Sequence, residues 1–300
     1  MPTVSVIIPA QNRPVMLAEA IESALAQTFR DLEIIVVLNE ATFETAEVAR
    51  SFAFKSDIRI VEIGHSTLAA ARNAGVKQAR GEWLAFLDDD DLWAPEKIAM
   101  QLDAAKKYQS DLVTCEGTYF NNHGDIGGSA RDTMPKGLDF REALMVNNCV
   151  SGGSSAIART SVIRSLGGFD ETLVTCEDWD MWRRVSWSHR IHCIDRILVR
   201  YRRHNANLSG RSDAMLIGRA QLFAKTLADT PNNLRHMIKA AQLDYYLVLR
   251  DMLTMSQTIR LHQTTPWHHP TLRRIVKFLT FGLLRRARNI AIRRSGATSR

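Results

Sequence analysis

Short apolar runs alternate with amphipathic stretches along the first part of the chain. Five runs have the length of strands covered on both faces, and they span residues 4–9, 32–38, 58–63, 82–87 and 111–115. The segments between them have helical character, with approximate bounds of 14–27, 39–54, 66–79 and 95–108. Pro14 and Pro95 suit the first turn of a helix. Strand–helix alternation at this spacing predicts a parallel α/β sheet.

The pattern changes after residue 116. Residues 117–153 are rich in Gly, Asn and Ser and show weak periodicity. Strand-like and helix-like segments then mix, at 154–159, 177–187 and 192–204. From about residue 211 the pattern is helical. We therefore expect a second, mixed α/β region followed by a helical one.

Charge is unevenly distributed along the chain. The formal charge is +7, but residues 271–300 hold nine Lys and Arg and no acid, which leaves 30 basic and 32 acidic residues elsewhere. Apolar residues of this tail fall near one helical face. The tail is therefore expected either to lie on an anionic membrane surface or to dock on the protein. Nucleic acid binding is not expected, because the body is neutral and has no recognition motif.

Cysteine usage and hydropathy indicate a cytoplasmic protein. The four cysteines show neither CxxC nor metal-ligand spacing, so reduced thiols are expected. The first ten residues read as a strand rather than a leader. No stretch of the chain approaches the about 20 apolar residues of a membrane span.

Two common nucleotide-binding motifs do not occur in the sequence. The chain contains neither the dinucleotide-binding motif GxGxxG nor the P-loop motif GxxxxGK[ST].

Four consecutive carboxylates, Asp88 to Asp91, follow the apolar run that ends at Leu87. Ligands of open α/β sheets bind beyond the carboxyl ends of the strands, so these acids are expected at a crevice. Close carboxylates repel one another unless a cation lies between them, and Mg²⁺ or Mn²⁺ accepts such oxygen ligands. The alternative is a solvated acidic turn that caps the helix beginning near Pro95.

A second acidic cluster begins the helix predicted over 177–187. On a helix Glu177 and Asp180 share a face, whereas Asp178 points about 100° away from Glu177. By themselves these acids favour a structural role, paired with the arginines that follow at helical spacing, Arg183 and Arg184.

Several segments together resemble the family 2 glycosyltransferases. They are "VSVIIPAQN", "LEIIVV", "AAARNAGVKQARGEWLAFLDDDDLWAPEK" and "GGFDE…CEDWDMWRRV", and the match covers roughly residues 3–205. The resemblance implies an α/β GT-A fold, with a Rossmann-like central sheet, helices on both faces and a C-terminal helical extension. It implies a catalytic domain over 1–210, whose nucleotide-binding half is 1–116 and whose acceptor-binding half is 117–210. A helical region with a basic amphipathic tail then covers 211–300.

The activity implied by the resemblance is inverting, metal-dependent sugar transfer. The donor is a nucleoside-diphosphate sugar, with a UDP-sugar as first choice, and the acceptor is a saccharide or a lipid-linked saccharide. Such an enzyme would act at the inner face of a membrane, in envelope or surface polysaccharide synthesis. The rival hypothesis is a sugar-nucleotide-binding or scaffold protein of this fold that lacks turnover.

The resemblance also assigns roles to the acids. Asp88, Asp89 and Asp90 match the DXD motif. Asp90 would ligate Mn²⁺ or Mg²⁺ on the donor diphosphate, and Asp88 would contact the ribose or a metal-bound water; a register using Asp89 and Asp91 is the alternative. Inverting transfer needs a carboxylate that takes the acceptor proton. By similarity this base is Asp178, with Glu177 second and Asp180 third.

Other residues match family segments around the donor. Arg72, in "ARN", would reach the nucleotide or a phosphate, or else be an exposed helical arginine. Pro9 and Asn12 would border the base, although Asn12 also suits a turn. His204, in "YRRHNANLS", would lie near the diphosphate or metal, unless it is structural.

The second strand departs from the family pattern. The family usually has Asp-Asp-Gly-Ser there, and its first Asp contacts the nucleobase, whereas this chain has Leu38, Asn39, Glu40 and Ala41. Asn39 can donate and accept hydrogen bonds but carries no charge. This departure leaves the nucleobase open and is the reason for the rival hypothesis of a protein without turnover.

Overall fold

The computed structural model describes residues 1–54, 57–130, 138–204, 212–236 and 238–239. The chain divides into two compact units, Met1–Asn207 and Leu208–Arg300, and each is described by itself. The basic tail over 271–300 lies outside the described residues.

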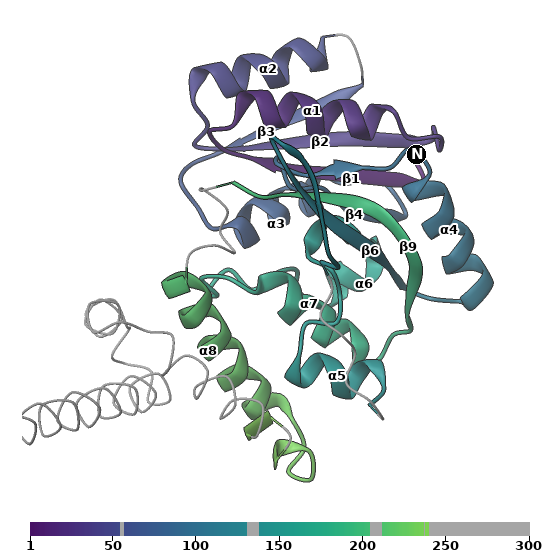
Figure 1. Cartoon of the computed structure of the whole chain (residues 1–300), viewed down its shortest axis with the longest axis vertical. Coiled ribbons are helices and arrows are strands. Elements are labelled where there is room, and N and C mark those ends of the chain that lie inside the picture. Colours follow the sequence, from purple (N-terminus) through teal and green to yellow (C-terminus); the bar gives the residue numbers. More distant parts are fainter. Residues whose placement is uncertain (55–56, 131–137, 205–211, 237, 240–300) are drawn as a thin grey trace, which may run out of the picture. The chain divides into compact units, whose positions relative to one another are not determined.

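Strands of the first unit join in one sheet (Figure 1). They are β1 (Val4–Ala10), β2 (Leu32–Asn39), β3 (Ile58–Ile63), β4 (Trp83–Phe86), β5 (Leu92–Trp93), β6 (Leu112–Asn121), β7 (Gly124–Gly127), β8 (Ile157–Arg159) and β9 (Ile191–Arg202). The helices are α1 (Pro14–Leu25), α2 (Phe43–Ala53), α3 (Leu68–Gln78), α4 (Lys97–Tyr108), α5 (Phe140–Val146), α6 (Thr160–Ser165) and α7 (Glu177–Ser186), with a 3₁₀ turn, η1, at Gly153–Ser155. The elements predicted from periodicity are confirmed, with ends that differ by a few residues.

The strand order is β3-β2-β1-β4-β8-β6-β9-β5, and β7 pairs with β6. The first four strands are parallel, as predicted; for example Val4 lies opposite Leu32 on β2 and Trp83 on β4. The prediction that 111–115 continues the same parallel series holds for direction, since β6 runs the same way as β4, but the two strands are not neighbours. Strand β8 lies between β4 and β6 and is antiparallel to both, so the sheet is mixed.

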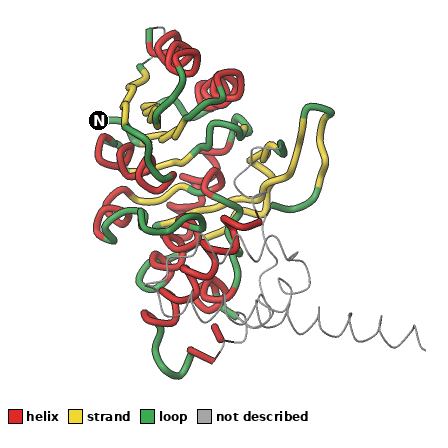
Figure 2. The backbone as a smooth tube through the Cα atoms, turned by 90° about the vertical axis from the view of Figure 1, so that its left-hand side faces the viewer, coloured by secondary structure: helices red, strands yellow, loops and turns green. Residues whose placement is uncertain are grey.

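Helices cover both faces of the sheet (Figures 1 and 2). Because successive strand side chains point to opposite faces, Val6 and Ile8 join the core with α1, α2 and α4, whereas Ile7 faces α3. Gly75 of α3 permits this approach, since a Cβ at Gly75 would overlap the Ile7 side chain. The mixed α/β fold class, with helices on both faces, is thereby confirmed.

Threonine side chains cap two of the helices at the carboxyl edge of the parallel strands. The Oγ1 of Thr42 accepts the Thr45 N–H at 3.4 Å at the start of α2, and that of Thr67 accepts the Ala70 N–H at 3.2 Å at the start of α3. The cap of α3 is thus Thr67 rather than Ser66, the first residue of the predicted helical segment. These caps fix the loops that follow β2 and β3.

The second unit contains α8 (Ser212–Asp229). Its Ala220, Leu222 and Phe223 are buried. Across the residues that the structure describes, no helix combines the length and the apolar character needed to cross a membrane.

Candidate active site

The four acids after β4 lie against the protein rather than in solvent. Asp89, Asp90 and Asp91 are 2%, 8% and 4% exposed, and Asp88 is half-buried. They do not cap α4, because the residue before that helix is Glu96 and it makes no capping hydrogen bond. The alternative of a solvated acidic turn is therefore wrong, and buried carboxylates require compensating cations or donors.

Arg13 and His204 compensate the middle pair of acids. Arg13 forms ion pairs with Asp90 and, at 3.2 Å, with Asp89, whose other oxygen accepts the Gln11 N–H at 3.2 Å. The Nε2 of His204 lies 2.9 Å from the Asp90 Oδ2 atom. Burial raises the pKa of Asp89 to about 7, although the Arg13 charge opposes this. The sequence analysis did not predict Arg13 as a site residue. Its only signal in the sequence is that a positively charged residue follows the first strand.

Asp91 has a structural role. One of its oxygens accepts the Ser154 hydroxyl at 2.6 Å and the other accepts the Arg202 N–H at 3.2 Å. The Ser154 hydroxyl oxygen in turn accepts the Asp88 N–H at 3.1 Å, so it ties η1 to the end of β4. Both carboxylate oxygens of Asp91 are thus held by the protein, which argues against the alternative register that uses Asp89 and Asp91 as the pair. Ser154 was also missed by the sequence analysis.

The acids that begin α7 have three different environments. Asp180 is fully buried and pairs with Arg183 at 2.9 Å and Arg184 at 2.8 Å. The structural role that sequence alone favours therefore holds for Asp180. Glu177 is also buried but pairs with an arginine from another helix, at 2.5 Å. Asp178 is half-buried and accepts the Trp179 N–H at 2.6 Å.

Arg72 of α3 joins the two groups of acids. Its Nη1 donates to Glu177 at 2.5 Å, and its Nη2 donates to Asp88 at 2.7 Å. The Arg72 side chain is 2% exposed, so the alternative of an exposed helical arginine is wrong. Burial alone would lower the pKa of Arg72, but the neighbouring carboxylates raise it. The guanidinium is therefore a permanent charge between the end of β4 and the start of α7.

Burial also acts on the α7 acids beside Arg72. It raises the pKa of Glu177 to about 7 and raises the pKa of Asp178, in both cases against the Arg72 charge. A carboxylate whose pKa is raised towards neutral pH is a stronger proton acceptor, which is the property required of a general base.

Asn39 fastens the loop after β3. Its Nδ2 donates to the Ser66 carbonyl at 2.9 Å, and its Oδ1 accepts the Ser66 N–H at 3.0 Å. The neighbouring Glu40 is exposed, has a φ of 47°, and pairs with His65 at 2.9 Å. Of the three residues in place of the family's Asp-Asp-Gly, Asn39 and Glu40 are thus engaged with the β3–α3 loop, whereas Leu38 is buried in the core.

The remaining predicted residues lie after β1. Pro9 is buried at the end of that strand. The Oδ1 of Asn12 accepts the Thr42 N–H at 2.9 Å, which joins the loops after β1 and β2. This bond is the turn contact that the alternative predicted for Asn12, and the role of Asn12 beside the base stays a prediction. Trp179 and Trp182 of α7 are buried in the core, so neither offers a ring face on which a sugar could stack.

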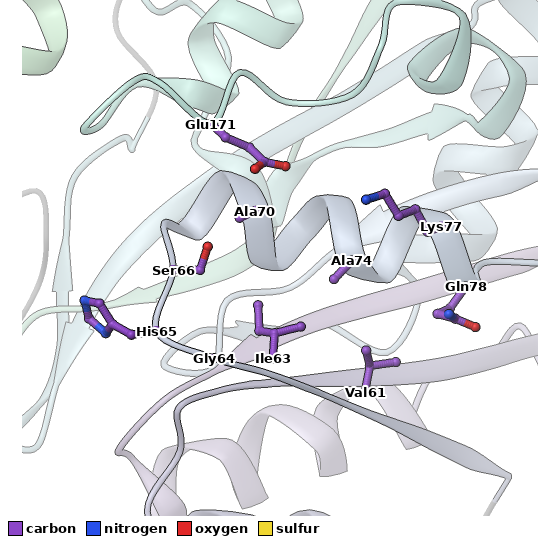
Figure 3. Close-up of a pocket in the computed structure, with 10 residues that line it drawn as sticks. All are labelled: Val61, Ile63, Gly64, His65, Ser66, Ala70, Ala74, Lys77, Gln78 and Glu171. Carbon is purple, nitrogen blue, oxygen red and sulfur yellow. The ribbon is translucent and has the colours of Figure 1, made fainter.

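A pocket of about 430 Å³ lies beside the loop that joins β3 to α3 (Figure 3). Val61 and Ile63 of the edge strand β3 form one side, and Ala70 and Ala74 of α3 form the other. Glu171 lies above the helix in this view. None of the predicted site residues lines the pocket.

The side chains around Asp90 supply some of the ligands that a divalent metal ion needs. Among the residues that the structure describes, no group of three His, Cys, Asp or Glu side chains is arranged to hold a metal. Asp90 and His204 nevertheless bring one carboxylate oxygen and one imidazole nitrogen within 2.9 Å of each other. Mg²⁺ and Mn²⁺ commonly use few protein ligands and complete their shell with waters and substrate phosphates. The same Asp90 oxygen also pairs with Arg13, so these two side chains supply only part of a metal site, and a bound diphosphate would have to supply further ligands.

Sequence relatives of the chain are glycosyltransferases. One from Rickettsia felis is 31% identical over 211 residues, which are 68% of this chain and 35% of the relative. The Escherichia coli UDP-Glc:alpha-D-GlcNAc-diphosphoundecaprenol beta-1,3-glucosyltransferase WfgD is 26% identical over 209 residues, 69% of this chain and 79% of that protein. The chain thus spans about a third of the length of the Rickettsia felis relative.

Solved structures share the fold. TarS 1–349 of S. aureus in complex with UDP-GlcNAc has a TM-score of 0.63 and 19% identity, over 79% of this chain and 69% of that one. The mannosyltransferase PcManGT from Pyrobaculum calidifontis, in complex with GDP-Man and Mn²⁺, has a TM-score of 0.60 and 16% identity. The match covers 96% of this chain and 87% of that one. The family model described as "Glycosyl transferase family 2" matches residues 5–167. This chain, with its GT-A fold, therefore belongs to glycosyl transferase family 2.

Proposed function

We propose that this chain is an inverting, metal-dependent glycosyltransferase. It moves a sugar from a nucleoside-diphosphate donor, UDP-sugar by first choice, to a saccharide or lipid-linked acceptor in envelope or surface polysaccharide synthesis. The observation that carries the proposal is the Arg72 bridge, which places the acids after β4 and the acids of α7 in one cluster. A donor diphosphate at the first group would then lie beside a base at the second.

Asp178 is the base of this proposal. Its carboxylate takes the proton of the acceptor hydroxyl while that oxygen bonds to the anomeric carbon from the face opposite the diphosphate. The bond between the anomeric carbon and the diphosphate oxygen breaks, and the electron pair leaves with the diphosphate. The pairing of Glu177 with Arg72 and of Asp180 with two arginines supports the choice of Asp178.

Asp90 and His204 would hold Mn²⁺ or Mg²⁺. The ion, when bound, neutralises the negative charge that develops on the leaving diphosphate. Arg13 lies on the same Asp90 carboxylate and adds a second positive charge there. Only the neutral imidazole of His204 can act as a ligand, since protonation removes its lone pair.

The donor side is assigned to residues at the ends of β1, β2 and β4. Asp88 and Asp89 face the ribose and diphosphate, and Pro9, Asn12 and Asn39 border the nucleobase. A UDP-sugar is favoured because TarS is described in complex with UDP-GlcNAc and the E. coli relative is named for UDP-Glc.

A donor screen tests this function. We expect UDP with Mn²⁺ to raise the melting temperature, GDP and TDP to raise it less, and a UDP-sugar to be hydrolysed slowly without acceptor. Thermal shift with each nucleotide, with and without Mn²⁺, measures the first two, and release of UDP measures the third. Binding without hydrolysis would favour the sugar-nucleotide-binding protein, and the absence of both would refute the proposal.

A membrane location is part of the proposal. The E. coli relative is named for a diphosphoundecaprenol-linked acceptor, and the tail over 271–300 is basic and amphipathic in sequence. We expect the full chain to sediment with vesicles that contain anionic phospholipid and a chain without 271–300 to stay in the supernatant. Equal sedimentation of both would argue against a membrane role for the tail.

A further inference from the structure

Arg72 is enclosed by the protein and turned towards its acids. The residue is 1% exposed, and both Nη atoms donate to carboxylates, Glu177 and Asp88. Phe169 covers the guanidinium, whose carbon lies 5.6 Å from the ring centroid. Gly153 leaves no free space on another side, because a Cβ there would lie 2.6 Å from Nη2. So enclosed, Arg72 presents little surface to a nucleotide or phosphate.

The bridge controls how α7 begins. Glu177 is the first residue of that helix, and its carboxylate is held by Arg72 at 2.5 Å. Consecutive helical residues are about 100° apart around the axis, so fixing Glu177 also fixes the direction of Asp178. The residue before the helix, Cys176, has a φ of 66°, and so the chain turns sharply into this position.

We propose that Arg72 is a positioning residue, which holds Glu177 and Asp88 so that Asp178 meets the acceptor hydroxyl beside the bound donor, rather than a nucleotide-binding residue. This inference rests on the proposed function. It replaces the assignment of Arg72 to the nucleotide or phosphate that the family resemblance implies.

The charged groups around Asp178 come from three elements. Arg72 faces it from α3, Asp88 from the end of β4, and Glu177 is its neighbour on α7. Helix α5 meets α7 through the Trp179 indole, which donates to the Leu144 carbonyl, and its Arg141 lies over Trp187, beyond the far end of α7. At the end of α6, the Leu166 carbonyl accepts a hydrogen bond from Arg184 of α7.

Two variants are expected to shift the pH dependence in opposite directions. Arg72→Gln removes a cation beside Asp178, which raises the pKa of the base, so the acidic limb of the kcat–pH profile moves up by about 1 unit or more. Glu177→Gln removes a like charge, so the limb moves down. Arg72→Lys keeps the charge but cannot bridge two carboxylates, so kcat falls by about 10²-fold. The acidic limb of its kcat–pH profile moves less than that of Arg72→Gln.

The measurements are UDP-glucose hydrolysis across pH and calorimetric binding of UDP with Mn²⁺. We expect unchanged UDP affinity in Glu177→Gln and in the control Arg200→Gln, which removes an exposed ion pair with Asp125. In the Arg72 variants UDP affinity should fall less than kcat does, because Asp88 loses its partner while the other donor-side residues keep theirs. Loss of UDP affinity with unchanged kcat, or unmoved limbs, would overturn the inference. If the Arg72 variants do not fold, the Glu177→Gln profile decides alone. Inactivity of the wild-type chain would refute the proposed function instead.

Discussion

Replacing Asp178 with asparagine is expected to lower sugar transfer by about 10²- to 10⁴-fold, the usual contribution of a general base. The amide keeps the size of the side chain but cannot take the acceptor proton. Donor affinity is expected to stay the same, because the donor diphosphate is assigned to the acids after β4. Steady-state hydrolysis of UDP-glucose and calorimetric binding of UDP with Mn²⁺ measure the two effects separately.

Asp195 of β9 offers a matched control for the same chemical change. It is exposed, and so Asp195→Asn is expected to leave both the rate and the affinity unchanged. A full rate in Asp178→Asn would show that another group accepts the proton, and Glu177 would then be tested next. Equal losses of rate and of UDP affinity would point to a role in binding the donor.

Replacing Asp90 with asparagine is expected to abolish the stabilisation of the UDP complex by Mn²⁺. Transfer should fall by about 10²- to 10³-fold, the range for loss of one preorganised electrostatic group. The amide retains an oxygen ligand but no charge. The change also removes the carboxylate that pairs with His204 and one of the two that pair with Arg13. Electron paramagnetic resonance of a Mn²⁺ titration measures affinity for the ion directly.

Asp125→Asn is the control, since Asp125 is exposed and pairs with Arg200 on the surface. It is expected to leave Mn²⁺ affinity unchanged. Unaltered Mn²⁺ affinity in Asp90→Asn would exclude this carboxylate as a ligand. In that case Asp88 and Asp89 would be the next acids to replace.

Local sequence patterns were sufficient for the elements of the first half. Strands β1 and β2 are covered on both faces, so each appears as an apolar run interrupted near its start only by Ser5 or Glu33. The acids after β4 were placed correctly at the end of a strand because Leu87 closes such a run. Strand β8 has three residues, too few to show a period, and its insertion between β4 and β6 was therefore missed.

Partners distant in sequence could not be predicted from local patterns. Arg72 and Glu177 are 105 positions apart, and only the packing of α3 against α7 brings them together. The same is true of Arg13 and Asp90, which are 77 positions apart. Asn39 was singled out for its chemistry, but its bonds go to the backbone of Ser66, and no side-chain pattern signals a backbone partner. The roles of the site residues remain predictions that the proposed variants test.

The place of β8 has a consequence for synthesis of the chain. One edge of β4 pairs with β1, and the other is completed by Ile157–Arg159. A nascent chain that has reached only α4 therefore carries a finished parallel half whose last strand still exposes unpaired backbone groups. Such open edges recruit other strands, and pairing across a long sequence separation is slow. Chains halted on the ribosome before residue 157 are thus expected to aggregate more readily than chains that include β8.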